Sequence, residues 1–206
     1  MKSVLISIQP KWCELIASGK KTVEVRKTRP KIDVPFKCYI YCTQGDALAY
    51  PCLNNPQFAI HRMITSRSLY GRQLTPKERE ESDYTFANGK VIGEFICRNI
   101  YFLDESDLFG GMDEISNSVI EEYSCVSIDE LLAYKGSKKE IYGWHISDLV
   151  IYDKPKELCE FRKYMSFFDD ISTEELEAEG VSGIRLKRPP QSWCYVDHQT
   201  EKGGAE

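Results

Sequence analysis

The chain has 206 residues, of which 42% are hydrophobic, and a net charge of −5. This length allows one sizeable core with added segments, and the acidic balance argues against a protein that coats nucleic acid along its whole surface. There is no apolar run long enough to cross a membrane and no export signal at the N-terminus, so we expect a cytoplasmic protein without membrane contact.

The eight cysteines are scattered, without the short paired spacing of a zinc site. Cys38 and Cys42 face the same side of one predicted strand, but four residues at about 3.3 Å each place them roughly 13 Å apart, too far to share one metal. The sequence also lacks a Walker A loop, a Rossmann glycine fingerprint and a His-Glu-x-x-His helix. We therefore expect free thiols, no metal and no cofactor.

Charge is unevenly distributed along the chain. Residues 1–43 contain nine Lys and Arg against three Asp and Glu, a local balance of +6, whereas residues 104–130 contain nine acidic residues and no Lys or Arg. Such asymmetry is compatible with a local anion site on an otherwise acidic surface, or with ordinary solvated charge.

The N-terminal segment predicts a strand followed by a helix. Residues 3–8 are almost uniformly apolar or β-branched, and Pro10 is well placed to begin a helix that ends at Gly19. Free N–H groups at the start of this helix, beside Lys11, could hold an anion and form one wall of a groove. The alternative is that Trp12 in the same turn is simply a core residue.

Residues 19–26 predict a turn followed by a strand that carries a dense set of charges. Alternation on that strand would place Thr22, Glu24 and Arg26 on one face and two valines on the other. A carboxylate flanked by lysine and arginine is suited to binding a polar, anionic ligand. The predicted ligand-binding residues are Lys11, Lys20, Lys21, Glu24 and Arg26.

Residues 36–43 predict the next strand, with one buried face and one tyrosine-bearing face that could pack or stack bases. Residues 44–88 break the strand pattern and are interpreted as an insertion. Within it, Thr75 and Glu78 form a capping-box pattern for a short helix to about residue 83.

Residues 90–102 form the longest strand-like run. Glu94 within it either faces solvent or points into the groove with a perturbed pKa. We expect residues 104–126 to be irregular, and Ser127 to cap a helix that is closed by Gly136.

Residues 144–152 predict the closing strand, in which His145 is interpreted as structural because no Cys or Ser pairs with it at diagnostic spacing. A charged connector should follow over 154–165, and a short helix should begin at Ser172. The prolines of 188–196 confine the last predicted strand to an edge of the sheet.

The pattern Gly19-x-Lys21-x-x-Glu24-x-Arg26 resembles the ASCH domain of the PUA-like superfamily, as do residues 93–95 and 142–148. The resemblance implies an α+β fold: a PUA-like partly open β-barrel of about five or six mixed strands with peripheral short helices and an insertion. It covers residues 1–153 as one domain. Residues 154–198 would be an extension that packs on the barrel, and residues 199–206 a disordered tail.

The superfamily is associated with RNA and modified nucleosides, so the resemblance implies that a basic groove around the motif binds one of these. Some small ASCH proteins are amidohydrolases that act on N4-acetylcytidine with a lysine, a threonine and a glutamate, and others are ribonucleases. Lys21 matches that lysine, but Glu24 stands at the threonine position, which leaves Thr22 as a substitute hydroxyl and Glu94 or Glu130 as the distal glutamate. A protein-interaction adaptor and any oligomeric state also remain open.

Overall fold

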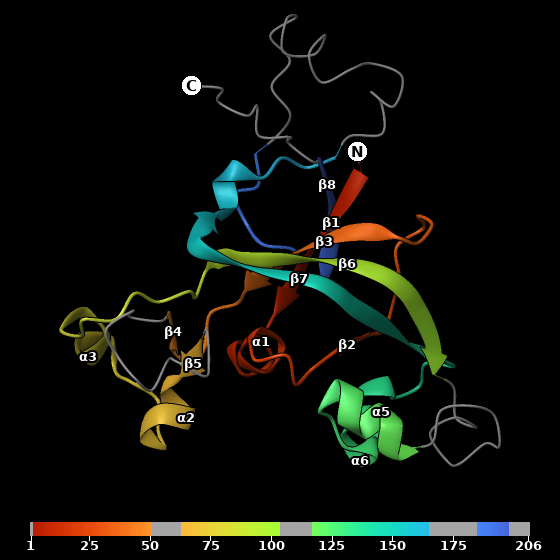
Figure 1. Ribbon diagram of the computed structural model, residues 1–206, viewed down its shortest axis with the longest axis horizontal. Coiled ribbons are helices and arrows are strands. Elements are labelled where there is room, and N and C mark those ends of the chain that lie inside the picture. Colours follow the sequence, from red (N-terminus) through yellow and green to blue (C-terminus); the bar gives the residue numbers. More distant parts are fainter. Residues whose placement is uncertain (1, 51–62, 104–116, 165–184, 198–206) are drawn as a thin grey trace, which may run out of the picture.

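The computed structural model describes residues 2–50, 63–103, 117–164 and 185–197. A mixed six-stranded sheet forms the centre of the molecule (Figure 1). Along the sheet the strands follow the order β2 (Val23–Arg26), β7 (Ile141–Glu157), β6 (Lys90–Leu103), β3 (Phe36–Cys42), β1 (Lys2–Ile8) and β8 (Trp193–Asp197).

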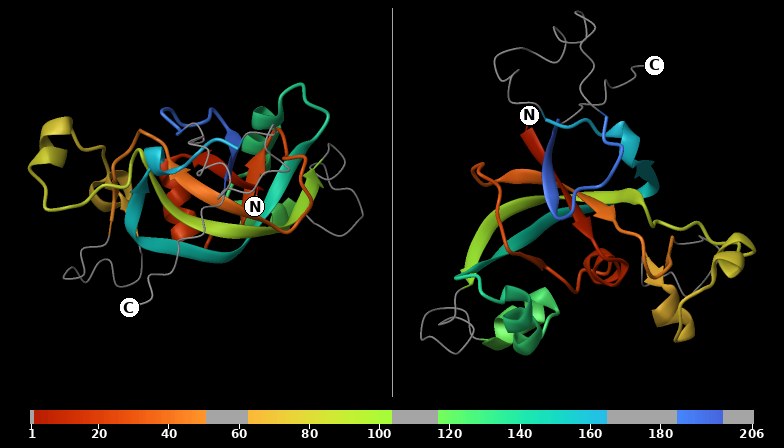
Figure 2. Two further views of the ribbon diagram at one scale, coloured as in Figure 1. Left: turned by 90° about the horizontal axis from the view of Figure 1, so that it is seen from above. Right: turned by 180° about the vertical axis from the view of Figure 1, so that it is seen from behind.

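The sheet curls without closing. β1 and β3 run parallel, and every other neighbouring pair is antiparallel. Figure 2 shows the long strands β6 and β7 curving around the core, while the outer strands β2 and β8 have no ladder between them in the described part of the chain. The predicted partly open barrel with short peripheral helices is confirmed.

The main core lies between the concave face of the sheet and helix α1 (Pro10–Ala17). Cys13 and Ile16 of this helix are fully buried, whereas Trp12 is half-buried. The helix begins at Pro10 and is followed by Gly19 with a φ of +75°, as the sequence predicted.

The opposite face of the sheet is covered by the C-terminal part of the chain. Tyr39 and Tyr41 of β3 are 5% exposed and pack with Phe161 and with Val196 of β8. The rings of Tyr39 and Phe161 lie 4.9 Å apart. The alternative that this tyrosine face stacks bases is therefore wrong, because residues of the C-terminal extension cover the face.

Two helices enclose β2. Helices α5 (Asn117–Ser124) and α6 (Ile128–Lys135) pack against Val23 and Val25, which face inward as predicted. The expectation of an irregular segment over 104–126 is wrong for residues 117–124. Ile120 is 5% exposed in α5 because its contact with β2 outweighs the acidic composition of the helix. Residues 104–116 lie outside the described residues.

The insertion forms a small unit between β3 and β6. It contains β4 (Leu48–Ala49), β5 (Ile64–Thr65), α2 (Ser66–Tyr70) and α3 (Pro76–Glu80). The capping box of α3 is confirmed, although the helix ends at Glu80 and not near residue 83. Helix α1 lies between this unit and the two helices α5 and α6, as Figure 1 and Figure 2 show.

The last elements differ from prediction mainly in length. β7 extends to Glu157 because its antiparallel ladder with β6 continues to Lys90, so the predicted connector begins as strand and then turns through the 3₁₀ helix η2 (Leu158–Glu160). β8 is an edge strand on β1, as predicted, and the two prolines lie before its first residue. The predicted helix at 172 and the tail after 198 lie outside the described residues. Within the described segments, no helix is long and apolar enough to span a membrane.

Candidate ligand-binding site

Three charged side chains of the motif form a buried cluster. One oxygen of Glu24 lies 2.9 Å from Nη2 of Arg26, and the other lies 3.4 Å from Nζ of Lys21. The side chains of Lys21, Glu24 and Arg26 are only 2%, 6% and 12% exposed. The predicted shared face of Glu24 and Arg26 is present, and the turn brings Lys21 to the same carboxylate.

Each cation of this cluster also holds a main-chain carbonyl of a distant element. Lys21 donates to the carbonyl of Ser124 at 2.6 Å, and Arg26 donates to the carbonyl of Ser7 at 2.5 Å. Both bonds of Arg26 use Nη2, and its buried Nε–H has no hydrogen-bond partner among the described residues. An unsatisfied buried donor is unfavourable by about 1–3 kcal/mol, so the Nε–H of Arg26 is an unpaired polar group inside the wall of the site.

A cavity of about 220 Å³ opens beside the cluster, and we call it the motif cavity. It adds aromatic surface from Trp12 and Tyr134 and polar groups from Gln9 and Glu130 to the three charged residues. The remaining lining residues are Ser7, Val25, Val126 and Leu131. The cavity thus combines a fixed charge cluster with rings on which a flat, polar molecule could stack.

A larger groove of about 830 Å³ adjoins the motif cavity, and we call it the insertion groove. Gln9 and Trp12 line both spaces. Lys11 and Lys20 line only the groove, so the structure divides the predicted basic residues between two neighbouring sites. The ammonium groups of Lys11 and Lys21 both lie over the Trp12 ring, at 4.0 and 4.9 Å from its centroid.

Thr22 does not line either space. It precedes β2, where its N–H donates to the carbonyl of Tyr123 and its own carbonyl accepts from the N–H of Ile146. Its backbone therefore links α5 to β7. The strand alternation that grouped Thr22 with Glu24 does not extend to it, because the strand begins at Val23.

Glu94 is also separate from the motif cavity. Its carboxylate accepts hydrogen bonds from Lys37 and Tyr152, each at 2.6 Å, on the sheet face that carries Tyr39. Burial raises the pKa of Glu94, but these hydrogen bonds and the Lys37 charge outweigh it and hold the pKa below its usual value. The carboxylate thus serves an ion pair on that face.

Of the two glutamates considered for a distal role, Glu130 is the one that lines the motif cavity. It is exposed, and its carboxylate accepts the N–H of Ser127 at 3.3 Å as part of the capping box of α6. The same helix supplies Tyr134. The start of α1 was predicted as a wall of the groove, and Gln9 and Trp12 do line the cavity. Sequence reasoning missed Ser7 and Tyr134; for Tyr134, no local pattern indicates which face of α6 meets the motif.

Comparison with known proteins places the chain in a family. The model of the ASCH domain matches residues 6–149, so the chain belongs to the ASCH domain family, which is associated with RNA binding. Its six-stranded mixed sheet forms a partly open barrel.

Among solved structures, the chain is similar to ASCH from Zymomonas mobilis, at 17% identity and a TM-score of 0.47 over 95% of this chain and 87% of that chain. A tyrosine-to-phenylalanine mutant of that protein matches at 18% and 0.47 over 96% and 91%, respectively. A serine-to-alanine mutant matches at 16% and 0.47 over 95% and 88%. No curated protein matches the chain.

Proposed function

We propose that the motif cavity binds one base with its ribose, either within RNA or as a free modified nucleoside. The observation that carries the proposal is the buried Lys21–Glu24–Arg26 cluster in the wall of a cavity that also presents Trp12 and Tyr134. Burying three charges is unfavourable unless they are paired and hydrogen-bonded. Clusters of buried charged groups are found preferentially at functional sites.

The cavity suits a base in size. Its volume of about 220 Å³ is below the ~300–1,000 Å³ of pockets that hold drug-sized ligands, so it fits a single base or nucleoside and not a longer chain. Trp12 and Tyr134 provide apolar surface for the ring, and stacking of a base on such a side chain contributes about 1–3 kcal/mol.

The polar groups of the cavity are complementary to base edges. Glu24 can accept from an exocyclic amino group, the contact that a carboxylate makes to cytosine. The ammonium of Lys21, which lines the cavity, can donate to a carbonyl or ring-nitrogen acceptor. The cluster of one carboxylate and two cations carries a net charge of +1, which the Glu130 carboxylate in the same cavity balances, so the cavity suits an uncharged base.

Two substitutions test this function without removing the buried cations. Tyr134→Ala removes a 39%-exposed ring, and Glu24→Gln keeps the shape of the side chain while removing its charge. Calorimetric titration with the four standard nucleosides and N4-acetylcytidine, and anisotropy with a labelled RNA hexamer, should show affinity reduced about 5- to 150-fold in Tyr134→Ala.

The matched control is Lys138→Ala, since Lys138 is exposed and lines neither space. Circular dichroism should show that all variants are folded. Wild-type affinity in both Glu24→Gln and Tyr134→Ala would exclude the motif cavity as the binding site.

The Lys21–Glu24 geometry favours a second candidate, hydrolysis of an amide on the bound base. Glu24 would take a proton from water, whose oxygen attacks the acetyl carbonyl while Lys21 stabilises the oxyanion. The bond between the acetyl carbon and N4 then breaks, N4 receives the proton from Glu24, and acetate and cytidine leave. Chromatography of N4-acetylcytidine incubated with wild type and Glu24→Gln tests this, and absence of cytidine release by the wild type would reject it.

A further inference from the structure

The insertion groove continues the motif cavity across Trp12. Its volume of about 830 Å³ is nearly four times that of the cavity, and Gln9 and Trp12 form the boundary between the two spaces. A chain that places one base in the motif cavity therefore has an adjoining space for the neighbouring nucleotides. A free nucleoside would leave this space empty.

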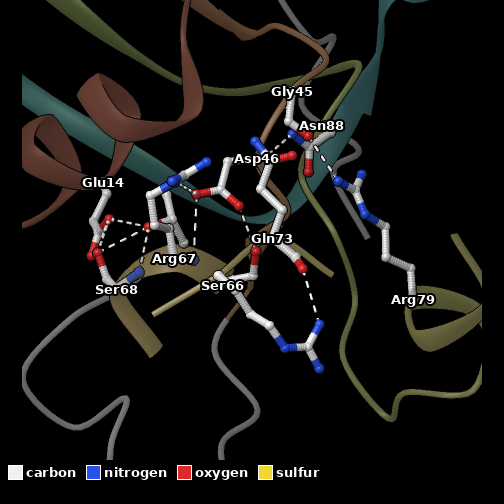
Figure 3. A network of polar contacts seen from close by, with 11 residues as sticks. Glu14, Gly45, Asp46, Ser66, Arg67, Ser68, Gln73, Arg79 and Asn88 are labelled. Carbon is white, nitrogen blue, oxygen red and sulfur yellow. Dashed lines mark hydrogen bonds and ion pairs between the residues drawn. The ribbon is translucent and has the colours of Figure 1, made fainter. Parts of the chain in front are cut away.

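Polar contacts hold the far wall of the groove to helix α1 and also stabilise the insertion internally (Figure 3). Oε2 of Glu14, in α1, accepts from the hydroxyls of Thr65 and Ser68 in the insertion, at 2.8 and 2.9 Å. Asp46 accepts from the Ser66 hydroxyl and from the N–H of Arg67, while its own carbonyl accepts from Asn88 at 2.8 Å. The groove is thus a preformed feature of the fold.

These contacts also determine the charge that the groove offers to a ligand. Its two carboxylates are engaged by the insertion, and Asp46 additionally lies 3.7 Å from Nε of Arg67. Lys11 and Lys20, by contrast, are exposed and have no ion-pair partner in the described part of the chain. The unpaired charge in the groove is therefore positive and lies on the side next to the motif cavity.

We infer that the insertion groove binds the sugar–phosphate backbone next to the nucleotide in the motif cavity, so that the ligand of the whole site is single-stranded RNA. Lys11 and Lys20 neutralise the flanking phosphates. This inference rests on the proposed function, because it takes the motif cavity as the place of the selected base. It adds that a strand binds more tightly than the nucleoside alone.

The test compares ligand length in two sets of variants. Two affinities are measured over a range of salt concentrations. One is for the tightest-binding of the four standard nucleosides and N4-acetylcytidine, and the other is for a labelled RNA hexamer that contains all four bases. The groove variant is Lys11→Ala with Lys20→Ala, its matched control is Lys138→Ala with Lys139→Ala, and the cavity variant is Glu24→Gln with Tyr134→Ala. The control lysines are exposed and lie outside both spaces.

We expect the wild type to bind the hexamer more tightly than the nucleoside. The groove variant should weaken hexamer binding about tenfold or more, and should reduce its salt slope by about 1.4, since each phosphate contact on a single strand contributes about 0.7. Its nucleoside affinity should fall less than its hexamer affinity, since only Lys11 of the pair reaches the boundary of the cavity, over the Trp12 ring. The cavity variant should weaken the binding of both ligands.

Different failures overturn different claims. If the groove variant binds the hexamer like the wild type at every salt concentration while the cavity variant loses both ligands, the groove inference is wrong and the proposed function stands. If the cavity variant retains both affinities, the proposed function fails, and the inference fails with it. Equal wild-type affinity for nucleoside and hexamer would also overturn the inference.

Discussion

The ammonium of Lys21 donates a 2.6 Å hydrogen bond to the main-chain carbonyl of Ser124, 103 residues further along the chain. Ser124 ends α5, and its neighbour Cys125 adopts a positive φ of 54° before α6 begins. One motif side chain thus fixes the corner between α5 and α6, and α6 is the helix whose residues line the motif cavity. Binding and stability are therefore coupled at this residue.

Lys21→Met should destabilise the protein by about 3 kcal/mol, because it leaves the Ser124 carbonyl and part of the Glu24 carboxylate without a buried partner. Urea unfolding measures the change. Its neighbour Lys20 is exposed, so Lys20→Ala should stay within about 0.5 kcal/mol of the wild type. Equal stabilities of the two variants would show that the Lys21 contacts contribute little.

Gly93→Ala should destabilise the sheet more than Gly143→Ala. A Cβ on Gly93 would lie 2.3 Å from the main-chain carbonyl oxygen of Val150, which cannot move without distorting the β6–β7 ladder. At Gly143 the nearest atom, at 2.9 Å, is a methyl group of Val23 that can rotate away. We expect thermal unfolding to show that Gly93→Ala lowers the free energy of unfolding by about 2–3 kcal/mol and that Gly143→Ala lowers it by less. A larger loss in Gly143→Ala would contradict this account.

Glu94→Gln should change how stability depends on pH. The pKa of Glu94 is lower in the folded protein than in the unfolded chain, so its ionised form stabilises the fold above the unfolded pKa of about 4.3. That stabilisation is lost as the pH falls through the folded pKa. The variant should be less stable by about 1–2 kcal/mol at pH 7, and the difference should shrink below about pH 4. Denaturant titrations from pH 3 to 7 measure it, and a constant difference would exclude this linkage.

Glu14→Ala should loosen the insertion without unfolding the barrel. It removes the acceptor that Thr65 and Ser68 share, while α1 keeps its buried residues Cys13 and Ile16. Hydrogen-exchange mass spectrometry should show amides of residues 64–70 exchanging about 5- to 30-fold faster, with β1 and β6 unchanged. Glu80→Ala, at an exposed position of α3, is the control and should leave residues 64–70 at the wild-type rate.

Thiol reactivity should separate the cysteines by burial. Burial raises the pKa of Cys13 and Cys38 well above the usual value and that of Cys97 to about 12, so these thiols carry almost no thiolate at pH 8. Cys159 is exposed and, among the seven cysteines in the described segments, should react first with a thiol reagent. Mass-spectrometric mapping after brief alkylation checks the order, and labelling of Cys97 as fast as Cys159 in the folded protein would contradict it.

Local signals were sufficient for much of the fold. Pro10 at the first helical position, the N-caps Thr75 and Ser127, and the glycines after α1 and α6 correctly predicted three helices, because these signals depend on neighbours within one turn. Helix α5 was missed because its acidic residues hide the short apolar side that contacts β2. That contact is not a local property of residues 117–124.

In the candidate site, too, local sequence signals predicted some of the geometry, and the rest depends on tertiary contacts. Glu24 and Arg26 share a strand, so alternation placed them together, whereas Lys20 and Lys21 lie in the turn after Gly19 and reach different spaces. No periodic rule applies within a turn. The contribution of Tyr134 depends on how α6 packs against β2, which only the folded chain determines.

The pairing of β8 with β1 has a consequence for biosynthesis. β1 is made first, yet its outer edge obtains hydrogen-bond partners only when residues 193–197 have been made. Until then the nascent chain carries an apolar strand with unsatisfied main-chain groups, which can pair with the same strand of another copy. The chain should therefore be vulnerable to aggregation until residues 193–197 have been made, and a chain stopped before Trp193 should precipitate even though its motif is complete.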